Sequence, residues 1–340
     1  MEINQLDLFS GIGGFHLGFE RAGFKVNSYF SEVDKHAIAV YKHQFKNSTY
    51  VGSVVNIRGN ELPRIDLITF GSPCQDFSLA GKRKGMEGER SSLILEAIRL
   101  IHECRPRVFI WENVKGTFSS NDGADFAAIL QEFANIGGYR LEWQLLNTSW
   151  FLPQNRERIY LVGHLAEARG DWGGVFPIGE DDRAFVGERG QANWEFQKAQ
   201  SENVHARTIG SSTAKMALDS NFIKVKSATA RGYEEATEGD SINLSNPNSE
   251  TRRGRVGKGK AQTLETSCNQ AAVQDYRIRR LTPIECERLQ GFPDNHTQYG
   301  NYDGEVKEMS NTQRYKQCGN AVTVDVVQAI AEKLHPLFEK

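Results

Sequence analysis

The chain has 340 residues, of which 39% are hydrophobic and 25% charged, which suits one large domain or a large domain with a smaller companion. The 41 basic and 43 acidic residues give a net charge of −2, so any nucleic-acid surface must come from local charge segregation. No apolar run reaches the roughly 18–20 residues of a membrane span, and the first residues do not resemble a signal peptide. The 5 cysteines form no CxxC pair, which predicts a reduced intracellular setting without structural disulfides or metal.

In chain order, the first part of the sequence alternates short apolar runs with amphipathic stretches, which predicts a layered α/β domain. The predicted strands are 5–9, 27–31, 66–70, 107–111, 141–146 and 159–163, and the predicted helices are 13–23, 34–45, 92–103 and 124–136. Several strands, including 65–70, are apolar on both faces. Such strands are typical of a mostly parallel sheet that helices cover on both sides.

The composition changes over 165–276, which is rich in Gly, Ser, Thr, Asn and charge. A loop of that length is uncommon inside a compact domain, so we expect a small irregular domain, with a partner-dependent segment as the alternative. The aromatic residues that could form its core are Trp172, Phe176, Phe185, Trp194, Phe196, Phe222 and Tyr233. Helices are predicted again over 282–289 and 321–337. The expected divisions are 1–163, 164–276 and a C-terminal segment, 277–340, that returns to the first domain.

A glycine turn follows the first strand, in the run Phe9-Ser10-Gly11-Ile12-Gly13-Gly14. Glycines allow a tight turn and a close approach to a ligand, and the helix that follows offers free N–H groups. Glu32 lies at the end of the next strand, where a carboxylate can accept hydrogen bonds from ribose hydroxyls. The pattern indicates a nucleoside-containing cofactor, and the alternative is a turn with no ligand.

His16 occupies the position at which a dinucleotide fingerprint requires its third glycine. This departure disfavours a nicotinamide oxidoreductase. It favours a cofactor without a pyrophosphate, such as S-adenosylmethionine.

Cys74 lies just past the end of strand 66–70, at the sheet edge where α/β proteins place their ligands. A thiolate there could act as a nucleophile, whereas a lone cysteine is more often simply buried. Glu112 follows the next strand, and Arg156 and Arg158 share one face of an extended segment. Together these groups suit attack on a polar heteroaromatic ring. The alternatives are a helix N-terminal carboxylate for Glu112 and a solvated edge strand for the arginines.

In content and order, the motifs of this chain resemble those of bacterial and phage cytosine-5 DNA methyltransferases. The matching runs are Phe9–Gly14, Pro73-Cys74-Gln75, Glu112-Asn113-Val114, Gln154-x-Arg156-x-Arg158, Arg280–Pro283 with Leu289–Pro293, and Gly319–Val322. The resemblance implies a Rossmann-like S-adenosylmethionine-dependent methyltransferase domain with a mostly parallel sheet. It also implies a small target-recognition domain in the irregular stretch.

The resemblance assigns catalytic roles to four residues. Cys74 is expected to attack carbon 6 of cytosine and Glu112 to hold or protonate ring nitrogen 3, while Arg158 contacts the cytosine carbonyl. Arg156 is expected to help position the nucleophile. The implied contacts to S-adenosylmethionine are Phe9, Gly11, Gly13, Glu32, Val33, Pro73, Leu93, Asn320, Ala321 and Val322.

One position departs from the family pattern. The family often has Gly-Asp-Ile after the third strand, and its Asp contacts the adenine amino group. This chain has Gly52-Ser53-Val54 instead, so Asp66 or a backbone carbonyl is expected to replace that contact.

DNA contact is expected from two basic segments. Carbon 6 is inaccessible inside a duplex, so the target base must leave the stack. The segment 79–88 carries Lys82, Arg83 and Lys84 among glycines, which suits a mobile catalytic loop that contacts phosphates. The segment 251–260 carries five cations and no acid, namely Arg252, Arg253, Arg255, Lys258 and Lys260. An ordinary solvated loop is the alternative for both segments.

The sequence therefore predicts a DNA (cytosine-5-)-methyltransferase that acts on a short double-stranded sequence. The alternatives are a tRNA cytosine-5 methyltransferase and a non-catalytic DNA-binding relative. We expect a monomer in the cytoplasm of a bacterium or a phage-infected cell. A restriction–modification setting, with a cognate endonuclease as a functional partner, is also expected.

Overall fold

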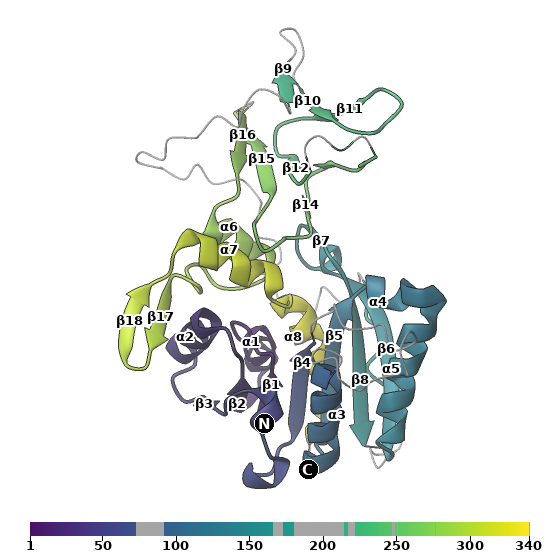
Figure 1. Cartoon of the computed structure of the whole chain (residues 1–340), viewed down its shortest axis with the longest axis vertical. Coiled ribbons are helices and arrows are strands. Elements are labelled where there is room, and N and C mark those ends of the chain that lie inside the picture. The colour runs from purple at the N-terminus through teal and green to yellow at the C-terminus, as the bar shows by residue number, and fades with distance from the viewer. Residues whose placement is uncertain are drawn as a thin grey trace.

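The larger lobe of the protein, here called the body, is built on one seven-stranded sheet (Figure 1). The computed structural model describes residues 1–72, 92–165, 173–179, 214–216, 222–246, 249, 251–275 and 277–339. The strand order is β3-β2-β1-β4-β5-β8-β6. The strands are β1 (Glu2–Leu8), β2 (Lys25–Ser31), β3 (Thr49–Tyr50), β4 (Leu67–Gly71), β5 (Val108–Val114), β6 (Tyr139–Asn147) and β8 (Glu157–Leu165).

The sheet is mostly parallel, as predicted. The strands from β3 to β5 pair in parallel, while β8 runs antiparallel to both β5 and β6. All six predicted strands are present in this sheet, and its one further strand is the two-residue β3. The sequence did not predict β7 (Gln154–Asn155), the hairpin over 299–308 or the strands of the smaller lobe. The carboxyl ends of β1, β2, β4 and β5 therefore lie along one edge of the sheet.

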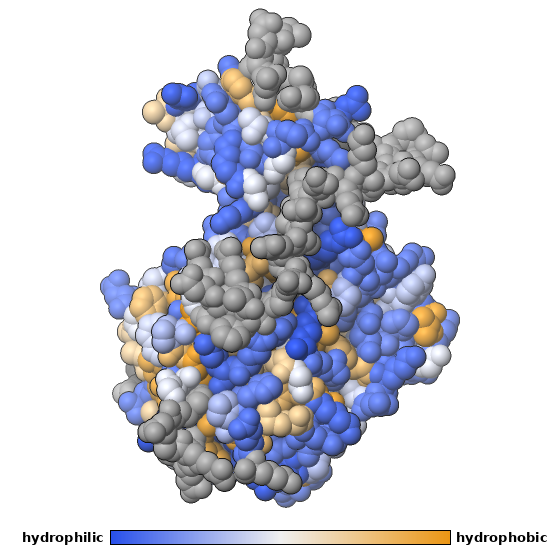
Figure 2. Space-filling view, turned by 180° about the vertical axis from the view of Figure 1, so that it is seen from behind, coloured by the Kyte–Doolittle hydropathy of each residue, from blue (hydrophilic) through white to orange (hydrophobic). Residues whose placement is uncertain are grey.

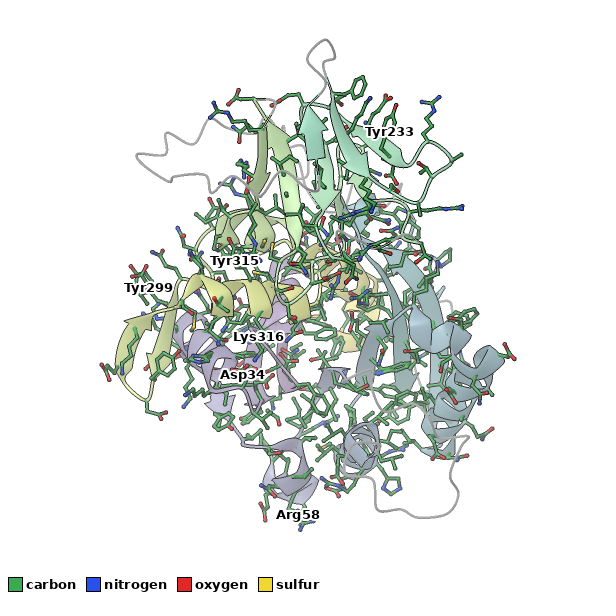
Figure 3. The ribbon with its side chains drawn as sticks, turned by 45° about the horizontal axis from the view of Figure 1, so that its top comes forward. Asp34, Arg58, Tyr233, Tyr299, Tyr315 and Lys316 are labelled. Atoms are coloured by element: carbon green, nitrogen blue, oxygen red, sulfur yellow. The ribbon has the colours of Figure 1, made fainter. Side chains whose placement is uncertain are left out.

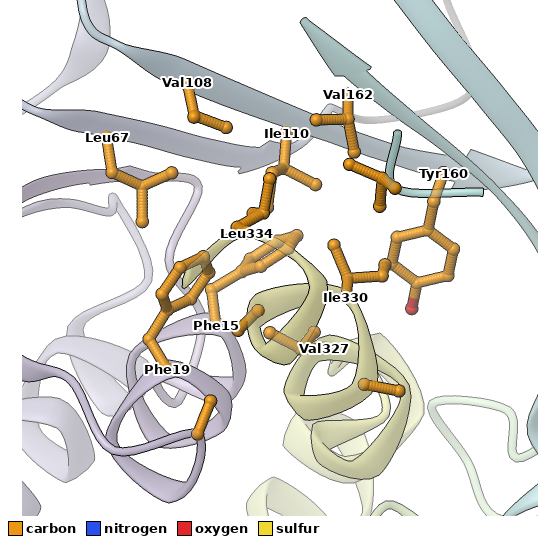
Figure 4. Packing of buried hydrophobic residues seen from close by; sticks show 14 of the residues in the cluster. Phe15, Phe19, Leu67, Val108, Ile110, Tyr160, Val162, Val327, Ile330 and Leu334 are labelled. Carbon is orange, nitrogen blue, oxygen red and sulfur yellow. The ribbon is translucent and has the colours of Figure 1, made fainter. Parts of the chain in front are cut away.

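Helices cover both faces of this sheet and produce three layers. On one face, α1 (Gly14–Arg21) and α8 (Val324–Lys333) pack against the strands (Figure 4). On the other face lie α3 (Ser92–Cys104) and α5 (Ala124–Asn135). Neighbouring residues Leu67 and Ile68 show the alternation, since each joins the core on a different face. Burying such a side chain contributes roughly 1.5–3 kcal/mol.

The remaining helices and turns of the body are short or lie at its margin. They are η1 (Val54–Asn56), η2 (Gly59–Glu61), α2 (Lys35–Gln44), α4 (Gly116–Ser119), η4 (Ser120–Gly123), η5 (Thr148–Trp150) and α9 (His335–Phe338).

The C-terminal segment passes back over the first elements of the chain. It contains α6 (Pro283–Leu289), the hairpin β17 (Tyr299–Tyr302) and β18 (Glu305–Glu308), and α7 (Asn311–Asn320). The helix predicted from residue 321 begins only at Val324, because the backbone at Ala321 and Thr323 is extended. Gly14 and Gly18 of α1 allow this return, since a Cβ at either would collide with Val322 or Val327.

The smaller lobe consists of two antiparallel sheets above the body (Figure 1), and Figure 2 shows the two lobes of unequal size from behind. One sheet has the order β11-β10-β9 and the other the order β13-β12-β15-β16. The strands are β9 (Ala214–Met216), β10 (Ile223–Lys226), β11 (Tyr233–Ala236), β12 (Ser241–Asn243), β13 (Val256–Gly257), β15 (Gln270–Gln274) and β16 (Arg277–Arg280).

The core of the small lobe differs from the aromatic core that the sequence suggested. The hydrophobic cluster in its described part consists of aliphatic residues: Ile223, Val225, Ala236, Ile242, Ala271 and Val273. Phe176 packs on the body, where the backbone N–H groups of Val175 and Phe176 donate to Glu142. Phe222 and Tyr233 are half-buried, whereas Trp172, Phe185, Trp194 and Phe196 lie outside the described residues.

A buried carboxyl lies in the central strand β1. Asp7 accepts hydrogen bonds from Thr69 Oγ1 at 2.8 Å and Tyr41 Oη at 3.3 Å, and Tyr41 also contacts His16 Nδ1 at 3.1 Å. Burial raises the pKa of Asp7 to about 8, although these hydrogen bonds lower it in part. Asp7 is therefore protonated at neutral pH.

We predict that Asp7 makes the folded state lose stability as the pH rises from about 4 to about 8. The folded protein holds this proton more tightly than the unfolded chain, whose Asp has the ordinary value of 3.8, so stability falls through that window. Asp7→Asn should remove this part of the pH dependence, which urea unfolding at several pH values measures. An identical decline in the wild type and in Asp7→Asn contradicts the prediction.

Candidate active site

The glycine turn after β1 and the end of β2 form one corner of the carboxyl edge. Gly11 and Gly13 have positive φ values of 53° and 82°, and Phe9 also adopts a left-handed conformation with φ 51°. Glu32 holds the corner together. Its Oε2 accepts from Gly11 N at 3.0 Å, and its Oε1 accepts from Val33 N at 2.7 Å and Asp34 N at 2.9 Å.

This corner has features that fit a nucleoside ligand. Oε1 of Glu32 already accepts two hydrogen bonds, whereas Oε2 accepts only that of Gly11 within the described part of the chain, which leaves it a lone pair. Val33 beside it is 76% exposed, which is unusual for a large apolar side chain. Among the described residues, a Cβ at Gly11 would meet no atom beyond its chain neighbours within 4 Å, so none of them fills the space in front of the turn.

The C-terminal motif packs against the start of α1, directly after this corner. Asn320 is exposed, Ala321 is buried, and Val322 packs against Gly14. The buried Arg156 fixes this run from behind, since Nη2 donates to Ala321 O at 2.8 Å and Nη1 to Gly319 O at 3.4 Å. Burial and the nearby Arg158 lower the pKa of Arg156 to about 10, so it stays charged at neutral pH. Arg156 thus supports the backbone of the C-terminal motif.

The end of β4 is anchored directly before Pro73 and Cys74, which lie outside the described residues. Ser72 Oγ accepts from Trp111 Nε1 at 3.0 Å, and Asn113 Nδ2 donates to Ser72 O at 3.2 Å. The Asn113 Oδ1 atom in turn accepts from Val114 N at 2.8 Å and Thr117 Oγ1 at 3.0 Å. These anchors were not predicted from the sequence, although Asn113 stands within the Glu112-Asn113-Val114 motif.

Glu112 and Arg158 lie together beside the end of β4. Glu112 pairs with Gly71 in the sheet register, and a Cβ at Gly71 would stand 3.1 Å from Glu112 Oε2. Its Oε1 lies 3.1 Å from Arg158 Nε, in an ion pair whose side chains are only 10% and 15% exposed. The predicted carboxyl and one predicted guanidinium thus meet beside Gly71, which precedes Cys74 by three residues in the chain.

A polar network joins the active-site edge to the small lobe. Gln154 Nε2 donates to Leu289 O at 2.8 Å and to Gln290 Oε1 at 3.2 Å, and Gln154 Oε1 accepts from Leu264 N at 3.0 Å. Strand β7 (Gln154–Asn155) also pairs in parallel with β14 (Ala261–Gln262). Residues 261–264 therefore attach the small lobe beside Arg156 and Arg158, a junction that the sequence analysis did not predict.

The five cations of 251–260 occupy different environments. Arg253 and Lys260 are exposed, and Arg252 is half-buried with Nη1 3.3 Å from Ser245 O. Lys258 is exposed but forms an ion pair of 2.6 Å with the largely buried Asp240. Arg253 Nε donates to Ala228 O at 2.8 Å.

Arg255 differs from the others because its side chain is fully buried. It donates to Asn243 O at 3.1 Å from Nη2 and to Lys226 O at 3.1 Å from Nη1. In this structure Arg255 has no exposed surface from which to contact DNA, and it joins β10 to β12. We therefore leave Arg255 out of the proposed DNA interface.

The other predicted site residues are placed as follows. Leu93 is half-buried in the first turn of α3, and Ser53 precedes η1 near the edge strand β3. Asp66 lies at the amino end of β4 and accepts from Asn4 N at 3.1 Å, so it stands at the wrong end of the strand to replace the adenine contact. Lys82, Arg83 and Lys84 lie outside the described residues.

The described ranges contain neither a metal-ligand cluster nor a membrane-spanning helix. No group of three or more His, Cys, Asp or Glu side chains there is arranged to hold a metal ion. The helices described in those ranges are also too short or too polar to cross a bilayer.

Comparison with known proteins agrees with this architecture. The family model for C-5 cytosine-specific DNA methylase matches residues 3–335. The type II methyltransferase M.Bsp6I of Bacillus sp. is 31% identical over 343 residues, covering 96% of this chain and 97% of that protein. The type II methyltransferase M.NlaX of Neisseria lactamica is 31% identical over 346 residues, covering 97% of this chain and 95% of that protein.

A solved structure shares the fold. The structure of the Dnmt2 methyltransferase of S. pombe superimposes with a TM-score of 0.63 at 19% identity, covering 99% of this chain and 100% of that one. The mostly parallel sheet with helices on both faces is a Rossmann-like fold, which this chain shares with that methyltransferase. The chain belongs to the C-5 cytosine-specific DNA methylase family, and its enzyme class is DNA (cytosine-5-)-methyltransferase.

Proposed function

We propose that this protein transfers a methyl group from S-adenosylmethionine to carbon 5 of cytosine within a short, specific double-stranded DNA sequence. The observation that carries the proposal is the meeting of Glu112 and Arg158 beside the anchored end of β4, directly upstream of Cys74. Family membership supports the same chemistry.

The corner formed by Phe9, Gly11, Glu32 and Val33 fits the nucleoside part of S-adenosylmethionine. We assign the free lone pair of Glu32 Oε2 to a ribose hydroxyl and the exposed side chain of Val33 to the adenine face. Asn320 to Val322 are assigned to the same site, while Gly13, Pro73 and Leu93 complete the proposed set. When bound, S-adenosylmethionine supplies an electrophilic methyl group on a sulfonium centre.

The residues of the chain activate the cytosine. The Cys74 thiol loses its proton to water and its sulfur bonds to carbon 6, while the electron pair of the 5,6 double bond shifts onto carbon 5 and makes that atom nucleophilic. Glu112 holds or protonates ring nitrogen 3, and Arg158 stabilises the charge that develops on the carbonyl oxygen. Arg156 keeps the C-terminal motif in place behind the site. After methyl transfer, loss of the carbon 5 proton and of the Cys74 sulfur restores the aromatic ring.

We propose that one lobe catalyses methyl transfer and the other recognises the target DNA. In this division, the catalytic body is assigned to residues 1–163 and 277–340 and target recognition to 164–276. The lobes of the structure depart from these bounds at two places, since β16 (Arg277–Arg280) belongs to a sheet of the small lobe and Phe176 packs on the body. The attachment of β14 to β7 supports a recognition lobe fixed beside the catalytic arginines. Lys82, Arg83 and Lys84 are assigned to a loop that contacts the DNA around the extruded cytosine.

Lys260 is the strongest DNA-contact candidate among the described cations. It is exposed, and Ala261 after it donates to Pro153 O at 2.8 Å, so it stands beside the segment that carries Arg156 and Arg158. Arg253, seven residues before Lys260, is also exposed. Arg252 donates to Ser245 O and Lys258 pairs with Asp240, so both have partners within the lobe.

We predict that Lys260→Gln weakens DNA binding about two- to ten-fold and reduces the salt dependence of log K by about one. Fluorescence anisotropy at several salt concentrations measures both quantities. Lys307→Gln, an exposed lysine of β18 far along the chain from this loop, is the matched control and should bind as the wild type does. Equal affinity and equal salt slope for Lys260→Gln and the wild type would remove Lys260 from the interface.

Purified protein, labelled S-adenosylmethionine and duplex DNA test the proposed function directly. Bisulfite sequencing of DNA from expressing cells then reports the methylated site. Label appearing only in tRNA supports the tRNA methyltransferase alternative, whereas DNA binding with no transfer supports a non-catalytic relative. The type II names of the bacterial relatives support a restriction–modification setting. A monomer, a location in a bacterial or phage-infected cytoplasm and a cognate endonuclease stay predictions from the sequence.

A further inference from the structure

An ion pair connects two of the segments that carry proposed cofactor contacts. Lys316 Nζ, on α7, lies 2.6 Å from Asp34 Oδ2, at the start of α2 (Figure 3). Asp34 comes two residues after Glu32, and Lys316 comes four residues before Asn320. The pair thus links the loop that carries Glu32 and Val33 to the helix that ends at Asn320, the first of the proposed C-terminal contacts.

Asp34 is well fixed on its own side of this link. Its Oδ1 accepts from His36 N at 2.9 Å and caps α2, while its backbone N–H donates to Glu32 Oε1 at 2.9 Å. Burial raises the pKa of Asp34, but the bonds from Lys316 and from the backbone of α2 outweigh it and hold the value below the ordinary one. Asp34 therefore carries its charge at neutral pH.

A displacement of Asp34 would also move the Glu32 carboxylate, because the two residues are hydrogen-bonded. Glu32 Oε1 accepts from both Val33 N and Asp34 N, and its Oε2 holds Gly11 N. These bonds form a continuous path from Lys316 through Asp34 to the glycine turn. The side chains of Lys316 and Asp34 are 45% and 27% exposed, so the pair is only partly screened by water.

We propose that Lys316 is a positioning residue for cofactor binding, which holds the loop from Glu32 to Asp34 in its binding conformation through Asp34. This role rests on the proposed function. In the absence of Lys316 the loop samples other conformations. The apparent affinity for S-adenosylmethionine then falls in proportion to the fraction of molecules whose loop is in the binding conformation. The chemical step does not use Lys316, so the turnover at saturating cofactor is retained.

The test compares Lys316→Met with Lys42→Met. Lys42 also pairs with the C-terminal segment, through Asp303 at 2.8 Å, but from the far end of α2. We expect Lys316→Met to raise the dissociation constant and the KM for S-adenosylmethionine about two- to five-fold with kcat unchanged. Lys316→Arg should restore wild-type values, and Lys42→Met should leave them unchanged.

A second measurement does not depend on activity. Amide hydrogen exchange of residues 32–34 in the protein without cofactor should be faster in Lys316→Met than in the wild type or Lys42→Met. Unchanged exchange together with unchanged cofactor affinity overturns the proposal, as does a loss of DNA affinity or kcat with normal cofactor binding. If the wild type itself binds no S-adenosylmethionine, the proposed function fails, and the exchange measurement still decides whether Lys316 orders the loop.

Discussion

Cys74→Ala is expected to abolish methyl transfer while DNA and cofactor binding persist. The proposed reaction begins with a bond between the Cys74 sulfur and carbon 6, and alanine has no group that can form it. We expect the rate to fall at least about a thousand-fold, since the carbon 5 position of an unactivated cytosine is a poor nucleophile. A methylation assay with labelled S-adenosylmethionine measures the loss, and gel-shift and calorimetric measurements follow the two binding steps.

Cys104→Ala is the matched control for this experiment. Cys104 is a free, half-buried thiol at the end of α3, and burial raises its pKa to about 11, so it carries little thiolate at neutral pH. The control should retain full activity. A DNA duplex with 5-fluorocytosine at the target should form a covalent adduct with the control and none with Cys74→Ala. Methyl transfer by Cys74→Ala at the wild-type rate would contradict covalent catalysis. A variant that neither folds nor binds DNA and cofactor would assign Cys74 a structural role.

The body of the fold could be predicted from the sequence because its core strands carry an unambiguous signal. Residues 66–70 and 107–111 are apolar on both faces, and both appear as central strands of the sheet. By contrast, α7 has the polar sequence Asn311–Asn320, which lacks an apolar stripe. Its position depends on tertiary contacts, such as the hydrogen bond from Tyr315 Oη to Leu281 O at 2.8 Å, which no local pattern predicts.

In the candidate site too, the sequence predicts the positions of some charged residues but not of others. The proximity of Glu112 and Arg158 could be predicted from the sequence, because both lie near strand ends at one edge of the sheet. The five cations of 251–260, however, are alike as sequence. Residues 255 and 257 are buried and 258 is exposed, following the alternation around β13, but the run has no apolar residue before Val256 to set that register. Only the fold distinguishes the buried Arg255 from the exposed Lys260.

A buried ion pair in the C-terminal segment gives the largest expected effect on stability. Glu287, on α6, has no exposed surface and accepts from Arg314 Nη2 at 2.9 Å, Asn295 N at 2.8 Å and Thr297 N at 2.9 Å. Thr297 Oγ1 also donates to Glu287 and accepts from Arg314 Nε at 3.1 Å. The turn that these bonds fix carries His296, whose Nε2 lies 2.9 Å from Ile12 O in the glycine turn.

We expect Glu287→Gln to lower the free energy of unfolding by about 3–5 kcal/mol, because it leaves the buried Arg314 guanidinium without a counter-charge. Urea denaturation measures this loss. Glu305→Gln is the control, since Glu305 and Lys307 form an ion pair whose side chains are 70% and 53% exposed, and it should cost less than about 1 kcal/mol. Adding Arg314→Met to Glu287→Gln removes the stranded charge, so the double variant should be more stable than Glu287→Gln alone. A double variant less stable than Glu287→Gln would mean that Arg314 stabilises the turn by packing, independently of its charge.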